Sequence, residues 1–150
     1  MNSLFPFTVR RVDWCDACNE LSAVRKLVFI DEQKVPVHLE WDDLDPVSAH
    51  VLAQSSEGES IGTGRLLPDG HIGRMAVVRG WRGRGVGSGL LHELMRIAHE
   101  AGFPEVRLNA QTHALQFYAS HGFLVEGPIF LDAGIEHRHM RCALRGPSIR

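Results

Sequence analysis

Apolar and polar residues follow different spacings along the chain, and each spacing predicts an element. Between residues 87 and 101 the apolar side chains recur as on one buried helix face, at Leu90, Leu91, Leu94, Ile97 and Ala98. Gly102 then ends this predicted helix. Before it, the apolar run from Met75 to Val78 has the length of a buried strand. The centre of the sequence therefore predicts a strand, a glycine-rich loop and a helix over residues 72–101.

The rest of the chain combines short strand patterns with one further long helix. Leu21, Val24 and Val28 have helical spacing, which predicts a first helix over residues 17–30 with Asp16 as its N-cap. Pro36 ends any helix, so residues 31–48 are expected to be mostly loop. Strand patterns fall at residues 7–12, 50–54, 60–67, 71–78, 106–110, 123–125 and 137–144, and a short helix falls at 115–119. This order predicts one domain over residues 1–150 of the α+β class, with a mixed, mostly antiparallel sheet flanked by helices.

Length and composition are typical of a soluble globular protein. The 150 residues are 44% hydrophobic and 23% charged, which are ordinary values for one folded domain. No apolar run reaches the ~18 to 20 residues of a membrane span. Arg10 and Arg11 follow the apolar residues of the amino end, which is the wrong order for a secretory signal. We therefore expect a cytoplasmic protein with no membrane partner and, at a net charge of −2, no nucleic-acid partner.

Charge is unevenly distributed along the chain. Residues 31–45 contain six acids against Lys34 alone, whereas residues 74–84 contain four arginines and no acid. A basic stretch at the glycine-rich loop suits a phosphorylated cofactor. The acidic stretch suits a cationic substrate, with a solvated loop as the alternative interpretation.

The glycine-rich loop, residues 82–87, has the chemistry of an anion site. A loop that opens into a helix turns backbone N–H groups toward one point, beside the positive end of the helix dipole, and most often binds phosphate there. A P-loop is excluded because Gly85 is followed by Val86, Gly87 and Ser88 rather than by lysine and serine or threonine. A Rossmann loop fits poorly, because Gly83, Gly85 and Gly87 are spaced two and two.

Two motifs in the right order resemble the GNAT superfamily of N-acyltransferases. The first is Arg-x-x-Gly-x-Gly, at Arg82, Gly85 and Gly87, after a strand that ends in Ala76 and Val77. The second is Ala-x-x-Phe-Tyr followed by Gly-Phe, at Ala114, Phe117, Tyr118, Gly122 and Phe123. Further positions resemble the ElaA-like branch, namely Arg25 with Val28 and Phe29, Glu32 with Gln33, residues 42–45 with His50, residues 72–74, Ala110 with Gln111, and Gly134 and Ile135 with His137 and Met140.

The resemblance implies acetyl-CoA as the acyl donor. The residues that would hold it lie in the loop and in the strand before it, with Tyr118 beside them: Met75, Ala76, Val77, Arg82, Gly83, Arg84, Gly85, Val86, Gly87 and Ser88. In the family the strand before the loop separates from its parallel neighbour and polarises the thioester carbonyl. By resemblance that role falls to the Val77 N–H, while the loop amides hold the pyrophosphate.

The resemblance also implies a proton donor, and it leaves the base open. Tyr118 is the only tyrosine, and in the family this position protonates the departing thiolate, which suits a phenol with a pKa near ~10. Glu32, His50, Glu126 and His137 all offer acceptors for the amine proton. Glu32 and His137 are preferred because both lie in branch motifs. His137 and His139 lie two apart on one face of a strand, but no third ligand stands nearby in the sequence, so no metal site is expected.

The sequence thus predicts an N-acetyltransferase in which an amine attacks the bound thioester directly, in a ternary complex. No cysteine is placed for a covalent acyl-enzyme. A longer acyl donor remains an alternative, and so does a non-catalytic acyl-CoA-binding or regulatory domain of the same fold. The acceptor is a small molecule or a peptide that the sequence does not identify, and dimers, which are common in the family, make a homodimer an open expectation.

Overall fold

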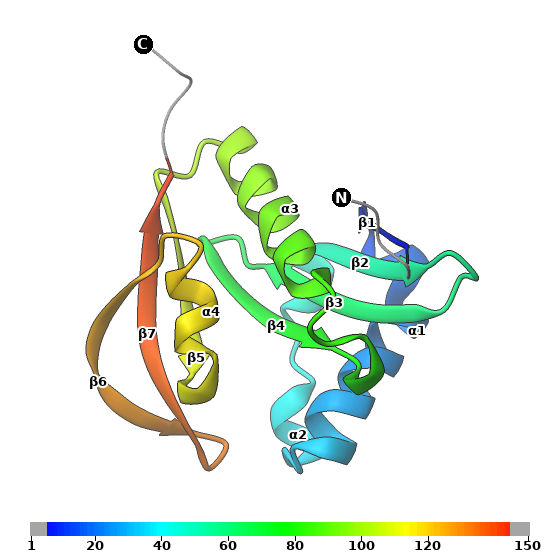
Figure 1. The fold of residues 1–150 in the computed structure, drawn as a ribbon, viewed down its shortest axis with the longest axis horizontal. Coiled ribbons are helices and arrows are strands. Elements are labelled where there is room, and N and C mark those ends of the chain that lie inside the picture. Colours follow the sequence, from blue (N-terminus) through cyan, green and yellow to red (C-terminus); the bar gives the residue numbers. More distant parts are fainter. Residues whose placement is uncertain (1–5, 145–150) are drawn as a thin grey trace.

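The computed structural model describes residues 6–144 and contains a seven-stranded sheet with the order β1-β2-β3-β4-β5-β7-β6 (Figure 1). The strands are β1 (Phe7–Val12), β2 (Ala49–Ser55), β3 (Ser60–Leu66), β4 (His71–Val77), β5 (Glu105–Gln111), β6 (Leu124–Asp132) and β7 (Ile135–Ala143). The helices are α1 (Trp14–Arg25), α2 (Val37–Glu40), α3 (Val86–Glu100) and α4 (Leu115–Ala119). Shorter or irregular turns are η1 (Lys26–Glu32), η2 (Asp45–Val47), η3 (Arg79–Trp81) and η4 (Thr112–Ala114).

The sheet confirms the predicted fold class. Only β4 and β5 are parallel, and every other neighbouring pair of strands is antiparallel. The closing strand β6 extends well beyond the predicted 123–125. The prediction stopped there because Glu126, Gly127 and Pro128 break the apolar pattern of the sequence. The register between β6 and β7 shifts across this interruption, between Glu126 and Phe130, and the strand continues beyond it.

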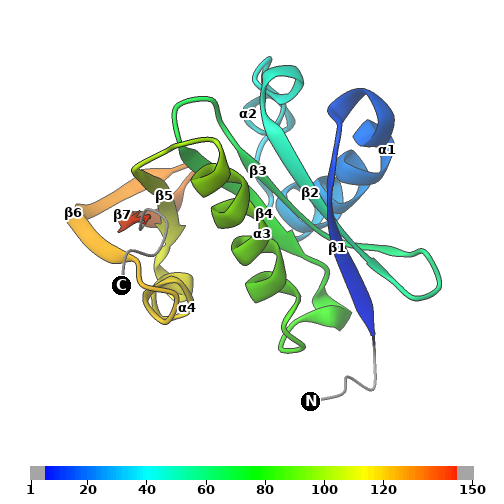
Figure 2. The ribbon, with the colours of Figure 1, turned by 90° about the horizontal axis from the view of Figure 1, so that it is seen from above.

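Helices cover both faces of the β1–β4 part of the sheet, α3 on one face and α1 with η1 on the other (Figure 2). Neighbouring residues of β2 divide between these layers, since Val51 and Ala53 belong to the core under α3 and Leu52 packs with Leu21 of α1. All four are buried. The main core continues from α3 to Tyr118 of α4 and the strands β5 and β7.

Among residues 6–144, no helix is long and apolar enough to cross a membrane.

The first helix begins earlier than predicted and changes its geometry. The predicted N-cap, Asp16, lies within the first turn, where its charge still suits the helix dipole, and Asp13 is the N-cap. Ala17 has non-helical angles, which kink the helix after this turn. From Lys26 the chain continues to Glu32 as a π-helix. The buried Val28 and Phe29 of η1 then pack against Ala76 of β4. The segment 31–48, predicted as mostly loop, contains α2 and η2.

Candidate active site

The glycine-rich loop presents backbone donors at the start of α3. Gly83 and Gly85 have φ values of +77° and +86°, which glycine adopts without strain, and Gly85 is the N-cap of α3. Among residues 6–144, no backbone carbonyl accepts a hydrogen bond from the N–H groups of Gly83, Gly85, Val86, Gly87 or Ser88. These donors and the positive end of the helix dipole suit a pyrophosphate group. The loop therefore fits the donor that the resemblance implies.

Close glycine contacts bring the start of α3 against the sheet and against α4. A Cβ at Gly62 or Gly64 of β3 would stand 2.9 or 2.7 Å from a leucine methyl group of α3. At Gly87, a Cβ would lie 3.3 Å from Cζ of Phe117. Since Phe117 precedes Tyr118 on α4, this contact places the loop beside the helix that carries the predicted proton donor.

A bulge in β4 opens the strand toward β5. The parallel pairing between these strands ends at Ile72 and Leu108. On the other side of β4, Arg74 and Met75 lie where β3 supplies only Gly64, and Arg74 has a φ of +50°. Beyond Ile72 the edge of β4 that faces β5 therefore pairs with no strand among residues 6–144. This open edge includes the residues to which the sequence assigns the thioester.

Three arginines and three carboxylates meet on the opposite side of β4. We call this set the arginine cluster: Arg25, Arg65, Arg74, Glu40, Asp42 and Asp45. Arg25 and Arg65 both donate to Oδ1 of Asp45, at 2.9 and 2.8 Å. Arg25 also donates to Oε2 of Glu40 at 2.9 Å, and Arg65 binds both carboxylate oxygens of Asp42. The six charges cancel, and most of them are buried.

The cluster holds the bulge through Arg74. Nη2 of Arg74 donates to the backbone carbonyl of Glu40 at 2.8 Å and lies 3.3 Å from Oδ2 of Asp42. Its Nε lies 3.1 Å from Oε2 of Glu40, an ion pair without hydrogen-bond geometry. The hydroxyl of Thr63 donates to the carbonyl of Arg74 at 3.0 Å. The positive φ of Arg74 is thus supported from both its side chain and its backbone.

The acidic stretch is therefore largely neutralised rather than solvated or open to a cation. Hydrogen bonding from Arg65 lowers the pKa of Asp42 to about 2. Burial alone would raise the pKa of Asp45, but its bonds to Arg25 and Arg65 outweigh burial and lower it. Neither interpretation of the sequence, a site for a cationic substrate or a solvated loop, included these ion pairs.

Arg82 joins the end of β4 to the end of η1. Its Nε donates to the carbonyl of Val77 at 2.9 Å, while Nη1 and Nη2 donate to the two carboxylate oxygens of Glu32 at 2.8 and 2.7 Å. Arg79 adds an ion pair to Glu32 at 3.2 Å. Hydrogen bonding from Arg82 lowers the pKa of Glu32, which makes this carboxylate a weaker base. The contacts give Glu32 and Arg82 a role in positioning Val77.

Tyr118 lies in an apolar environment on α4. Its ring makes edge contacts with Phe117 and Phe123, at centroid distances of 5.0 and 5.9 Å. Burial raises the pKa of Tyr118 to about 12, so the phenol is fully protonated at neutral pH. No hydrogen bond engages its hydroxyl within residues 6–144, which leaves the proton available to a bound group.

His137 has one ring nitrogen committed and the other available. Its Nδ1 lies 2.7 Å from the carbonyl of Ile135. A carbonyl only accepts, so Nδ1 carries a proton, and in the neutral ring Nε2 is the nitrogen with the lone pair. The ring is stacked on Phe130 at 5.9 Å and is 8% exposed. On β7, His137 pairs with Gln111, the last residue of β5. This arrangement suits a proton acceptor at the open end of β5.

The other two candidate bases lie elsewhere. His50 is 1% exposed on β2, its Nε2 lies 2.8 Å from the carbonyl of Asp45, and burial lowers its pKa. It therefore supports the arginine cluster. Glu126 of β6 is half exposed and pairs with Arg141 at 3.0 Å. Within the described residues, no hydrogen bond or ion pair joins Glu32, Tyr118 and His137 to one another.

Two polar contacts near these elements had little or no signal in the sequence. Gln33 and Gln111 lie in motifs of the ElaA-like branch, and their side-chain amides pair across the opening between β4 and β5, with Nε2 of Gln111 2.9 Å from Oε1 of Gln33. Oγ of Ser88 lies 3.0 Å from Nε2 of His121, which has no place in any motif.

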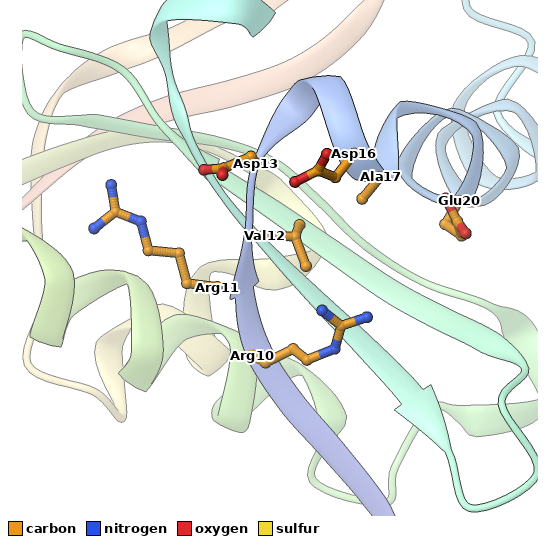
Figure 3. Close-up of a pocket in the computed structure, with 7 residues that line it drawn as sticks. All are labelled: Arg10, Arg11, Val12, Asp13, Asp16, Ala17 and Glu20. Carbon is orange, nitrogen blue, oxygen red and sulfur yellow. The ribbon is translucent and has the colours of Figure 1, made fainter.

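A cavity of about 360 Å³ lies at the junction of β1 and α1, away from these elements. Its lining mixes two arginines with three carboxylates, as Figure 3 shows: Arg10, Arg11, Val12, Asp13, Asp16, Ala17 and Glu20. None of these residues belongs to β4, β5 or the glycine-rich loop, so the cavity is separate from the candidate active site.

Similarity to known proteins agrees with the fold and the motifs. A model of the acetyltransferase (GNAT) domain matches residues 31–144. An uncharacterized N-acetyltransferase of Bacillus subtilis (strain 168), YjcF, is 39% identical over 121 residues, which cover 78% of this chain and 86% of that protein.

Two solved structures extend the similarity to nearly the whole chain. An acyl-CoA N-acyltransferase from Pseudomonas aeruginosa is 29% identical with a TM-score of 0.79, covering 93% of this chain and 99% of that one. Escherichia coli ElaA is 25% identical with a TM-score of 0.81, covering 91% and 99%. These similarities confirm the resemblance drawn from the two motifs. The chain therefore belongs to the GNAT acetyltransferase family.

Proposed function

We propose that the protein is an acetyl-CoA-dependent N-acetyltransferase whose acceptor amine attacks the bound thioester directly, in a ternary complex. The observation that carries the proposal is the open edge of β4 beside the N–H groups of Gly83 and of residues 85–88, which no backbone carbonyl among residues 6–144 engages. An acyl donor with a pyrophosphate needs both an anion site and free main-chain groups next to it.

The donor would be held by three parts of the chain. The N–H groups of Gly83 and of residues 85–88 would bind the pyrophosphate, and the charge of Arg84 adds to the field there. Met75, Ala76 and Val77 would hold the acyl arm along the open edge of β4. The Val77 N–H would donate to the carbonyl oxygen as it becomes negative, an interaction worth about 3 to 4 kcal/mol of barrier in comparable sites. Arg82 and Glu32 hold the Val77 carbonyl in place.

The transfer forms one bond and breaks one. The amine nitrogen attacks the carbonyl carbon, the C–N bond forms, and the C–S bond breaks with its electron pair on sulfur. Tyr118 would give its proton to that thiolate. Burial raises the pKa of Tyr118 to about 12 and makes it a weaker acid, but the same apolar surroundings also raise the proton affinity of the sulfur.

Nε2 of His137 is the acceptor that the geometry favours for the amine proton, since Nδ1 is already held by Ile135. Glu32 remains a second candidate from the sequence, but its lowered pKa makes it the weaker one. The cytoplasmic location and the homodimer also stay predictions.

The test compares wild type with Tyr118→Phe, using acetyl-CoA and longer acyl-CoA donors against a panel of amines. Release of free thiol is followed with time, and CoA affinity is measured by calorimetry. We expect an acetyl donor to be used and the variant to lose at least about tenfold in kcat, or 1.4 kcal/mol, at unchanged CoA affinity.

Other outcomes would change the proposal in distinct ways. A preference for a longer donor would reassign the acyl group. Tight CoA binding without thiol release from any amine would favour the non-catalytic binding domain. If the wild-type protein does not bind CoA at all, that result would contradict the role of the glycine-rich loop.

A further inference from the structure

The acceptor side of the opening offers little unpaired negative charge. Five of the six acids in residues 31–45 already have a cationic partner. Asp31 pairs with Lys26, Glu32 with Arg82, and the remaining three belong to the arginine cluster. A second positive charge on an acceptor entering here would lose water without gaining a free counter-charge, which is unfavourable.

Neutral amides lie across the opening instead. Gln33 follows η1, which packs on Ala76 of β4, whereas Gln111 ends β5. Gln111 lies three residues beyond Leu108, the last residue of β5 that pairs with β4, and so belongs to the stretch that faces the open edge of β4. The amide pair, 78 positions apart in sequence, therefore spans the opening beside the residues proposed to hold the acyl arm.

The hydrogen bonds of this pair leave capacity for a further amide. Nε2 of Gln111 donates to Oε1 of Gln33 at 2.9 Å, but the return bond from Gln33 is long, at 3.5 Å. Oε1 of Gln111 also accepts from Nε2 of His113 at 2.6 Å, which fixes how the amide is oriented. Among residues 6–144, each amide nitrogen keeps one unused N–H. A carboxamide or peptide group could replace the long bond and use these donors.

We propose that the acceptor is an amine that carries a neutral carboxamide or peptide group near its amino group, and that the Gln33–Gln111 pair binds that group. The inference rests on the proposed function, since it concerns the acceptor of the same site. The site discriminates against diamines and polyamines, whose second charge would face paired carboxylates. The carboxylates of Asp43, Asp132 and Glu136 are exposed, so water screens them and they do not supply a buried counter-charge.

The test uses three probes of similar length: β-alaninamide, 1,3-diaminopropane and propylamine. We expect wild type to prefer β-alaninamide in kcat/KM by about tenfold or more, because a site built for hydrogen bonds rejects analogues that lack them. Gln111→Leu should lose that preference, and Gln111→Glu should shift it toward 1,3-diaminopropane. Gln54→Leu makes the same change on β2 and should leave all three values unchanged. A wild-type preference for the diamine, or a preference that survives in Gln111→Leu, would overturn the inference.

Calorimetry with the CoA-loaded protein separates this inference from the proposed function, because it needs no turnover. Tighter binding of β-alaninamide than of 1,3-diaminopropane, lost in Gln111→Leu, supports the inference even if no thiol is released. Equal binding of the two, or no binding of any probe, overturns it. Melting temperatures of the variants show whether each is folded.

Discussion

The two sides of the opening between β4 and β5 are built from different chemistry. On the β4 side, paired charges hold the backbone: the arginine cluster supports the bulge at Arg74, and Arg82 fixes the carbonyl of Val77. On the β5 side, the two groups proposed to move protons take part in no ion pair among residues 6–144. Tyr118 is buried among aromatic rings, and His137 is held by a backbone carbonyl.

We infer from this difference that the β4 side maintains the backbone conformation and that the β5 side carries the proton transfers. Buried ion pairs lose much free energy when one partner is missing, so they suit a backbone that must keep one conformation. Proton donors and acceptors must change their charge during a reaction, and neutral surroundings let them do so. Changes on the β4 side should therefore alter stability, and changes on the β5 side should alter rate.

The largest effect is expected from Arg25→Met. Arg25 is 1% exposed, and its removal leaves Glu40 and Asp45 buried with less positive charge. We expect the free energy of unfolding to fall by about 3 to 5 kcal/mol, measured by urea denaturation. Lys26→Met is the matched control, because Lys26 also pairs with a carboxylate but is 63% exposed in its side chain. That variant should change stability by less than about 1 kcal/mol. Equal losses in the two variants would mean that the cluster adds nothing beyond an ordinary surface pair.

His137→Gln tests the β5 side. Glutamine keeps a polar group near Ile135 but cannot take the amine proton at Nε2. We expect kcat to fall about a hundredfold or more, at the lower end of what a general base contributes, with CoA affinity unchanged. A variant that keeps the full kcat would show that another group accepts the proton.

Gly64→Ala tests how tightly the bulge is packed. The new Cβ would stand 2.7 Å from a methyl group of Leu94 and 2.9 Å from Sδ of Met75. We expect a loss of about 1 to 3 kcal/mol in the free energy of unfolding, because the crowded side chains must move. Gly73→Ala, one residue before the bulge, is the control, since nothing lies within 4 Å of a Cβ there. A tolerated Gly64→Ala would show that β3 can shift away from α3 at little cost.

The smallest effect concerns acid stability. Folding lowers the pKa of Asp42 to about 2, so the folded state binds this proton less tightly than the unfolded chain. The stabilisation is present above a pH of about 4 and is lost as the pH falls toward 2, which amounts to about 1 to 2 kcal/mol for a carboxylate that water partly reaches. Urea denaturation of wild type and Asp42→Asn at several pH values gives the difference. The difference in the free energy of unfolding between the two proteins should become smaller as the pH falls from about 4 toward 2. A difference that stays constant would contradict the ion pair with Arg65.

Local patterns predicted most of the fold. The helical spacing of α3, the turns that bound β2, β3 and β4, and the glycine-rich loop all depend on neighbouring residues, and the structure contains these elements close to the expected positions. The start of α1 was wrong by three residues, because Asp13 and Asp16 are equally good caps in sequence. The π-helix had no visible signal, since the apolar spacing of Leu21, Val24 and Val28 fits an ordinary helix.

The arginine cluster could not be predicted, because its partners come from separate parts of the chain. Arg25 meets Asp45 across 20 positions, and Arg74 reaches the carbonyl of Glu40 across 34. The sequence alone does not distinguish an acidic residue that forms a buried ion pair from one that is exposed to water. The bulge at Arg74 was equally hidden, since a positive φ is usually marked by glycine. Short motifs mark the candidate site at the glycine-rich loop and at Tyr118, and the roles of these residues stay predictions. No motif selects the base, because several acceptors are equally plausible in sequence.

The arginine cluster also limits how this domain can be rebuilt. A designer who grafts the segment 33–48 onto another scaffold, to transfer its acceptor preference, would carry three carboxylates into a place without their partners. The charges of these carboxylates are neutralised only if Arg25, Arg65 and Arg74 are transferred together with the segment. Residues 25–74 are therefore best exchanged as one module, and single charge changes inside that module are poor starting points for directed evolution.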